Sequence, residues 1–357
     1  MAAAMALSDE ILFPTALATD TGDRVPASHL DRLAQAGLYG LFGPVEAGGL
    51  GFDQVTGLQV IEALARGCLT TTFVWLHHHA ALRAVADSAT PGLRTARLES
   101  MCRGKWRAGF TVGGILPGRP GLEARAVDGG WLLNGVIPWV TGWGLVDVIL
   151  VAAMGPDRTI VWALVDPLAS PTLTWQRLRL VAVNASVTGA VQLHDHFVPH
   201  ERVTGIQLLD EWAGPGGRLP GTGTDTGTDT DTGAETGAET GRGRHYQATL
   251  AGALALGVAG RCCLLLGEGP LDEELLACRS ALTQAAQTER DALPAARAAA
   301  SHLAVRAAAA LVVATGSRSV LLDQHPQRLM REATFLLVFG TRPPIPAELT
   351  NRFMAPG

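Results

Sequence analysis

The spacing of apolar residues changes twice along this chain of 357 residues, and that change limits the architectures open to it. Over residues 1 to about 105 apolar residues recur at helical spacing. From about 106 to 205 they form short β-branched runs separated by turn signals such as Asp128-Gly129-Gly130. Residues 245 to 353 are rich in Ala and Leu and again helical. This order predicts helices, then a compact antiparallel barrel or sandwich, then an antiparallel helical bundle.

A low-complexity segment interrupts this pattern before the last helices. Thr222 to Thr240 uses only Gly, Thr, Asp, Ala and Glu, nearly in repeats. None of these side chains is large enough to anchor a core. We therefore expect a flexible linker over residues 206 to 244, which divides the chain into domains at 1–105, 106–205 and 245–357.

Composition excludes several classes of partner. Charged residues make up 17% of the chain and the net charge is −5, which predicts no general attraction to nucleic acid or to an anionic membrane. The longest apolar stretch, Ala298 to Ala314, is interrupted by His302 and Arg306, so we interpret it as a buried helix rather than a membrane span. The five cysteines show no C-x-x-C or Cys/His metal spacing, which predicts reduced thiols and a cytoplasmic protein.

Three consecutive histidines, His77, His78 and His79, lie in a predicted helix from Thr70 to Val85. Consecutive helical residues point about 100° apart, so at most two of the three face one ion, and no carboxylate completes a site nearby. The sequence therefore favours packed or interface histidines and no metal site.

Four segments, in chain order, carry a family resemblance. They read GLYGLFGPVEAGGLG (37–51), NGVIPWVTG (134–142), FVPHERVTG (197–205) and PQRLMREA (326–333). Together they resemble the acyl-CoA dehydrogenase family of flavoproteins and cover most of the chain outside the linker. The resemblance implies an α+β protein with an N-terminal helical domain, a central antiparallel β-barrel and a C-terminal four-helix bundle.

The same resemblance implies FAD as cofactor. Trp139 and Thr141 alternate by two on one strand, so they are expected to face the same side. A Trp ring can cover a flat heteroaromatic ring and a Thr hydroxyl can bind its polar edge. In the family the matched Trp and Thr lie against the flavin. AGFTVGG (108–114) is similar to the family's flavin loop, and places backbone amides of Phe110 and Thr111 at the pyrimidine side. One of the three histidines is expected to line the substrate pocket.

The residue that removes a proton in this family has no counterpart here. Its usual glutamate falls where this sequence has Phe339 or Gly340, depending on the gap, and neither accepts a proton. Some members carry the base on the first helix after the β domain, where Tyr246 stands, and a tyrosine with a pKa of about 10 is a poor base at neutral pH. The sequence thus assigns no catalytic residue.

We therefore expect an FAD-dependent oxidoreductase that resembles acyl-CoA dehydrogenases, with the usual catalytic glutamate missing. Two alternatives stay open: a flavin-dependent monooxygenase on the same fold, and a non-catalytic paralogue that assembles with an active dehydrogenase. The resemblance also implies a small-molecule substrate, with an acyl-CoA thioester as the candidate. The nearly uncharged stretch from Ala298 to Ala310 predicts a homo-oligomer formed through the bundle.

Deleting Thr222 to Thr240 should leave stability nearly unchanged. Loop-closure entropy depends only weakly on length, and no side chain of this segment can pack. Thermal unfolding of the deletion variant beside the full chain measures the effect. A melting temperature lower by many degrees would contradict the interpretation of this segment as a linker.

Overall fold

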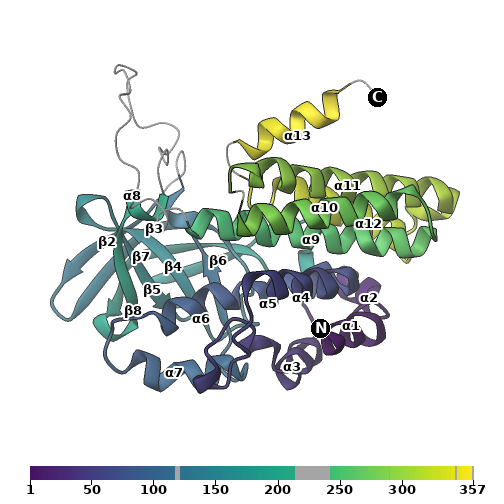
Figure 1. The fold of residues 1–357 in the computed structure, drawn as a ribbon. Helices are drawn as coiled ribbons and strands as arrows, with labels where there is room; N and C mark the ends of the chain where they lie inside the picture. The colour runs from purple at the N-terminus through teal and green to yellow at the C-terminus, as the bar shows by residue number, and fades with distance from the viewer. Residues whose placement is uncertain (117–120, 214–241, 289, 342–343, 356–357) are drawn as a thin grey trace, which may run out of the picture.

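A computed structural model describes residues 1–116, 121–213, 242–288, 290–341 and 344–355. Helices open the chain, a single sheet follows, and helices close it, as the sequence predicted. In Figure 1 the sheet lies at the left, the N-terminal helices run along the bottom, the last of them below the sheet, and the C-terminal helices lie at the upper right. The two helical parts therefore flank one end of the sheet and face each other.

The first part of the chain is helical up to residue 102. Its helices are α1 (Ala2–Leu7), α2 (Ala16–Thr21), α3 (Ala27–Gln35), α4 (Gln54–Gly67), α5 (Leu69–Leu76), α6 (His78–Ala86) and α7 (Leu93–Cys102). Helix α4 begins where Asp53 Oδ1 accepts the backbone N–H of Thr56 at 2.7 Å, an N-cap bond. The predicted single helix from Thr70 to Val85 is wrong, because the structure divides it at His77 into α5 and α6.

Eight strands form the central sheet. They are β1 (Ala108–Thr111), β2 (Leu122–Val127), β3 (Gly130–Val140), β4 (Val148–Met154), β5 (Thr159–Val165), β6 (Leu173–Arg177), β7 (Gly189–Pro199) and β8 (Val203–Leu208). Their order is β6-β7-β3-β2-β4-β5-β8, with β1 beside β4. Most neighbours are antiparallel, but β4 runs parallel to β1 and to the single paired residue of β2.

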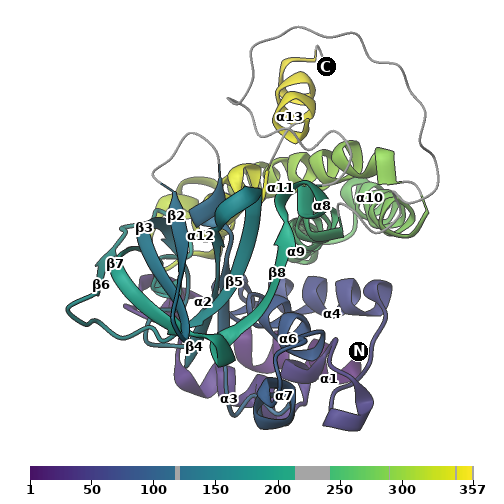
Figure 2. The ribbon, with the colours of Figure 1, turned by 90° about the vertical axis from the view of Figure 1, so that its left-hand side faces the viewer.

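The predicted closed antiparallel barrel is not what the structure has. Among the described strands β6 pairs only with β7 and β8 only with β5, and Figure 2 places them at opposite ends of the sheet. Side-chain hydroxyls bind the outer edge of β8: Ser88 Oγ donates to the carbonyl of Thr204 at 2.7 Å and Thr90 Oγ1 to that of Val203. These bonds satisfy edge acceptors that a barrel would satisfy with another strand.

The remaining helices pack as a bundle above the N-terminal helices. They are α8 (Leu209–Ala213), α9 (Arg242–Leu266), α10 (Pro270–Gln287), α11 (Leu293–Thr315), α12 (His325–Val338) and α13 (Ile345–Met354). Helix α9 contacts α10, α11 and α12, and on its other side α4. A Cβ on Gly257 of α9 would lie 2.6 Å from the carbonyl oxygen of Glu62, so a glycine is required where these two helices meet.

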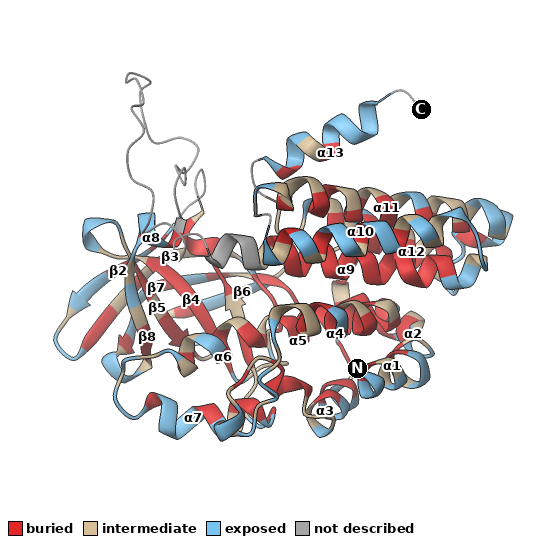
Figure 3. Cartoon of the chain, viewed as in Figure 1, coloured by how far each residue is buried: buried red, intermediate tan, exposed pale blue. Residues whose placement is uncertain are grey.

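One apolar core joins the first and last parts of the chain. Buried side chains of α4, α9 and α11 belong to the same cluster, and Figure 3 shows the buried faces of the two helical layers turned toward each other. Part of the range expected to be linker is ordered, since β8 extends to Leu208 and α8 follows. Its low-complexity part, residues 214–241, lies outside the described residues.

Two helical stretches, Gln247–Leu266 and Leu293–Val320, are long and apolar enough to cross a membrane by length and composition alone. The core helix of a soluble protein passes the same test. In the structure 78% of the tested window of the first stretch and 44% of that of the second are buried within the protein. This is weak evidence for a membrane span.

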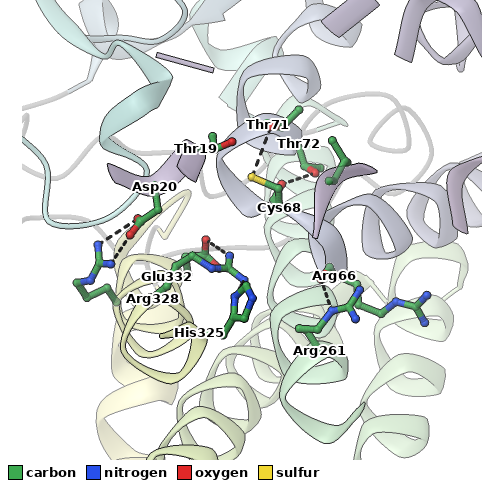
Figure 4. Close-up of polar contacts among 12 residues, drawn as sticks. Thr19, Asp20, Arg66, Cys68, Thr71, Thr72, Arg261, His325, Arg328 and Glu332 are labelled. Carbon is green, nitrogen blue, oxygen red and sulfur yellow. Dashed lines mark hydrogen bonds and ion pairs between the residues drawn. The ribbon is translucent and has the colours of Figure 1, made fainter. Parts of the chain in front are cut away.

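One buried ion pair lies within α12, and further ion pairs and a hydrogen bond connect α12 and α9 to the N-terminal helices (Figure 4). Arg328 Nη1 lies 2.6 Å from Oε1 of Glu332, and both side chains are 1% exposed. Arg331, on the same helix, binds Asp20 of α2 at 2.5 Å. Arg261 of α9 binds Asp9 at 2.6 Å and donates to the backbone carbonyl of Arg66 at 2.8 Å.

Replacing Arg328 by Met should destabilise the protein by about 3–5 kcal/mol, because Glu332 would be left buried without its partner. The double variant Arg328→Met/Glu332→Leu leaves no unpaired charge and should recover much of that loss. Urea unfolding of the three proteins measures both differences. A single variant that is no less stable than the double one would contradict the role of this pair.

Candidate active site

The residues with the predicted flavin roles come together where β1 and β3 end. Thr111 Oγ1 donates to the backbone carbonyl of Trp139 at 2.8 Å and accepts the N–H of Gly113 at 3.0 Å. Gly109 also lies against Thr141, since a Cβ there would be 3.2 Å from the Thr141 carbonyl. Three of the four predicted residues, Thr111, Trp139 and Thr141, are thus neighbours.

The strict alternation expected for Trp139 and Thr141 is interrupted. Strand β3 ends at Val140, and its pairing with β7 shifts register between Ile137 and Val140. A register irregularity of this kind redirects side chains. The Trp139 side chain is 45% exposed, which is unusual for so large an apolar group, whereas Thr141 is 6% exposed. Trp139 therefore has an exposed aromatic ring, and Thr141, two residues later, has a buried hydroxyl.

Phe110 has its side chain on the other face of β1. Its ring stacks on Trp162, with centroids 6.0 Å apart and planes 16° from parallel. Neighbouring residues of a strand point to opposite faces, so the ring of Phe110 and the hydroxyl of Thr111 diverge. Phe110 can serve the predicted site only through its backbone.

A chain of hydroxyl groups continues from Thr141 into the β6–β7 loop. Thr141 Oγ1 lies 3.1 Å from Thr188 Oγ1, which lies 2.8 Å from Ser186 Oγ, and all three residues are buried. Val183 and Val187 flank this turn with φ of 51° and 52°, a conformation that costs a β-branched residue energy. Backbone strain of this kind concentrates at functional sites.

Sequence reasoning did not single out Ser186 and Thr188. The available signal was two hydroxyl residues two positions apart, beginning two residues after Asn184, just before a strand. Their role depends on the backbone of the same loop, since the carbonyl of Ser186 accepts the N–H of Gly142 at 2.9 Å. The loop thus holds the segment that follows Trp139.

At the end of α12, where the resemblance predicts the catalytic carboxylate, aromatic side chains form a wall. Phe339 stacks on Phe335, with centroids 5.4 Å apart, and meets Phe73 of α5 edge to face at 4.9 Å. Gly340 has a φ of 64°, a left-handed conformation that suits glycine. The nearby acid Glu332 is held in its buried pair with Arg328.

A buried arginine, also missed from the sequence, fixes this end of α12. Arg297 of α11 donates through Nη2 to the carbonyls of Leu336 at 2.7 Å and Phe339 at 3.1 Å, and through Nη1 to Ser301. Burial lowers the pKa of its guanidinium to about 10, and within the described ranges no carboxylate pairs with it. Its charge instead faces the carbonyl end of a helix, which favours a cation. An arginine among alanines was the signal in the sequence.

The three histidines have three different surroundings. His77 Nδ1 lies 2.6 Å from the carbonyl oxygen of Phe73, one helical turn earlier. His78 Nδ1 accepts the N–H of Ala108 at 3.0 Å, and so joins α6 to β1. His79 packs edge to face on Trp75, with centroids 4.5 Å apart, and both its nitrogens are buried without a partner. In the portion of the chain that the structure describes, no three His, Cys, Asp or Glu residues gather as for a metal.

Tyr246 is the alternative position for the base. Residues 241–246 lie outside the side chains that the structure describes, so the roles considered for Tyr246 and its neighbour His245 stay predictions. No acid is described at the aromatic wall.

Comparison with known proteins concerns the family and the fold. The model of the acyl-CoA dehydrogenase N-terminal domain matches residues 2–105. The short-chain specific acyl-CoA dehydrogenase of Bos taurus is 25% identical over 56% of this chain and 50% of its own length. Benzylmalonyl-CoA dehydrogenase of Aromatoleum aromaticum is 26% identical over 54% and 52%. The alignments thus span about half the length of these curated relatives.

Solved structures extend the likeness over the whole fold. Butyryl-CoA dehydrogenase from Megasphaera elsdenii superposes with a TM-score of 0.76 at 17% identity, covering 98% of this chain and 94% of that one. PigA, solved with FAD and proline, superposes with a TM-score of 0.74 at 16% identity, covering 99% and 96%. Together with the family match over residues 2–105 and the curated relatives, these findings show that the chain resembles acyl-CoA dehydrogenases and shares their fold.

The described residues fit a flat ring system at one point. Trp139 has an exposed indole. The neighbouring Thr141 hydroxyl makes one hydrogen bond, to Thr188, and a hydroxyl group can make a second. The Thr111 hydroxyl already donates its hydrogen bond to the Trp139 carbonyl. The Thr111 hydroxyl therefore positions the strand that carries Trp139, and the contact predicted for Thr111 at the pyrimidine side of a flavin would come from its backbone amide.

The buried histidines should make the protein sensitive to acid. Burial, aided by the charge of Arg107, lowers the pKa of His78 to about 3, against about 6.5 in the unfolded chain. Between these values the unfolded state binds a proton that the folded state does not, so stability falls as the pH drops below about 6.5. The slope is about 1.4 kcal/mol per pH unit for each such histidine.

His78→Asn should make this slope shallower by about that amount, since its amide oxygen can still accept the Ala108 N–H. Urea unfolding at several pH values between 7 and 4 measures the slope, with the exposed His194→Asn as matched control. Equal slopes in the two variants would contradict a neutral buried His78.

Proposed function

We propose that this protein is an FAD-dependent oxidoreductase that acts on an acyl thioester of the acyl-CoA type. The observation that carries the proposal is the exposed indole of Trp139, held beside Thr141 at the end of β3 by the Thr111 hydroxyl. The fold shared with butyryl-CoA dehydrogenase, and with PigA solved with FAD, supports it. FAD, when bound, supplies a two-electron acceptor for this site.

The chain's own residues would bind and orient the two reactants. Trp139 would cover one face of the flavin ring and Thr141 would bind its polar edge. The aromatic wall of Phe73, Phe335 and Phe339 would exclude water and hold an apolar acyl group. The charge of Arg297 beneath Phe339 would keep the end of α12 in place while substrate enters.

A flavin-dependent monooxygenase is the second candidate. The aromatic wall favours it, because no described carboxylate stands at the end of α12 to remove a proton from carbon. Oxygen consumption that depends on reduced flavin and on an aromatic substrate would distinguish it from a dehydrogenase. A homo-oligomer formed through the helical bundle and a cytoplasmic location are part of the same proposal.

Trp139→Ala should lower flavin occupancy several-fold, because the stacking surface is lost. Thr141→Val should alter the flavin absorption spectrum or reduction potential more than the occupancy. Both are read from the visible spectrum of the purified proteins after incubation with FAD. Phe197→Ala is the matched control, since Phe197 is as exposed as Trp139 but lies on β7 at the far end of β3. A colourless wild-type protein, or full occupancy in Trp139→Ala, would contradict the proposed site.

A further inference from the structure

His77 occupies the break between α5 and α6, and its ring takes over a bond of the interrupted helix. Its backbone N–H turns to Trp75, and its Nδ1 lies 2.6 Å from the carbonyl oxygen of Phe73. A carbonyl oxygen can only accept, so Nδ1 carries the hydrogen of this bond. In the neutral ring the lone pair is then on Nε2.

The neutral form is the resting form of this ring. Burial lowers the pKa of His77 below 6.5, the bond to Phe73 partly opposes this, and no charged group contributes. Phe73 on α5 and Phe339 at the end of α12 pack against the ring, and neither titrates. At neutral pH the ring is therefore a base with a fixed tautomer.

The lone pair of His77 is also accessible, unlike those of its two neighbours. Nε2 of His78 and both nitrogens of His79 are sealed in the protein without partners, whereas His77 is half-buried and its Nε2 is not sealed. Within the described ranges Nε2 makes no hydrogen bond. It is free to accept a proton from a bound molecule.

His77 lies beside the aromatic wall at the end of α12. Its ring lies 4.8 Å from that of Phe73 and 6.3 Å from that of Phe339, centroid to centroid. Phe339 and its neighbour Gly340 are the two positions where the family resemblance puts the carboxylate that is expected to be missing here. His77 thus faces, from the neighbouring helix, the same wall from which that carboxylate would act.

We propose that His77 Nε2 is the general base of this site and removes the α-proton of a bound acyl thioester. The inference rests on the proposed function for the class of substrate. The Cα–H bond breaks, its electron pair remains on the thioester as an enolate, and an N–H bond forms at Nε2. The imidazolium keeps its Nδ1–H bond to Phe73, and it lies at the carbonyl end of α5, where a helix favours a cation.

Solvent exchange tests this step without any redox chemistry. Phenylacetyl-CoA has acidic α-hydrogens and no β-hydrogen that could leave as hydride, so the protein can only remove and return its α-proton. In D2O the wild-type protein should introduce deuterium at that carbon, read by mass spectrometry. His77→Asn keeps an N–H donor for the Phe73 carbonyl but removes the base, and should slow the exchange by about 10²–10⁴-fold. His194→Asn, on the exposed face of β7, should exchange like the wild type.

The outcomes separate this inference from the proposed function. Exchange that is absent in the wild type, or equally fast in His77→Asn, overturns His77 as the base, whether or not FAD binds. Failure to take up FAD overturns the proposed flavin site, and the exchange rates still decide the role of His77. If His77→Asn does not fold, ¹⁵N NMR of the wild type decides instead. A ring protonated on Nε2 at pH 7 overturns the proposal, and a ring protonated on Nδ1 alone supports it.

Discussion

The ion pairs of α12 set the position on which the candidate site depends. Removing Arg328 and Glu332 from water is costly, and their mutual contact at 2.6 Å offsets that cost only in one geometry. One turn away, Arg331 binds Asp20 and donates to the carbonyl of Val181 in the β6–β7 loop at 2.6 Å. The same helix is thereby tied both to the N-terminal helices and to the loop that supports Trp139.

This connection explains why a strained loop persists. The hydroxyl chain from Ser186 to Thr141 and the bond from Gly142 to the Ser186 carbonyl need Val183 and Val187 in left-handed conformations. Such conformations last only where the surroundings fix them. Contacts from α12 on one side and from β3 on the other supply that constraint. The end of β3 that carries Trp139 and the aromatic end of α12 are consequently held in one fixed arrangement.

Local patterns predicted the order of the elements, because helices and strands have different apolar periods. The four motifs predicted which strand and helix ends would form the candidate site. They could not predict that the sheet stays open, since closure depends on whether β6 and β8 meet, and hydroxyls of Ser88 and Thr90 bind the edge instead. The division of the predicted helix at His77 also escaped prediction, because it depends on a side chain taking the place of a backbone donor.

The aromatic wall and His77 together avoid the cost of burying a charged base among apolar side chains. A carboxylate placed among Phe73, Phe335 and Phe339 would lose its hydration and gain no cation, since Arg297 is already engaged by the carbonyls beneath them. A neutral imidazole has no charge to desolvate before it reacts. The break at His77 also fixes its tautomer through the helix itself, so no second residue is needed to orient it. Under the proposed function, a site with apolar side chains in place of the carboxylate would thus keep a base in His77.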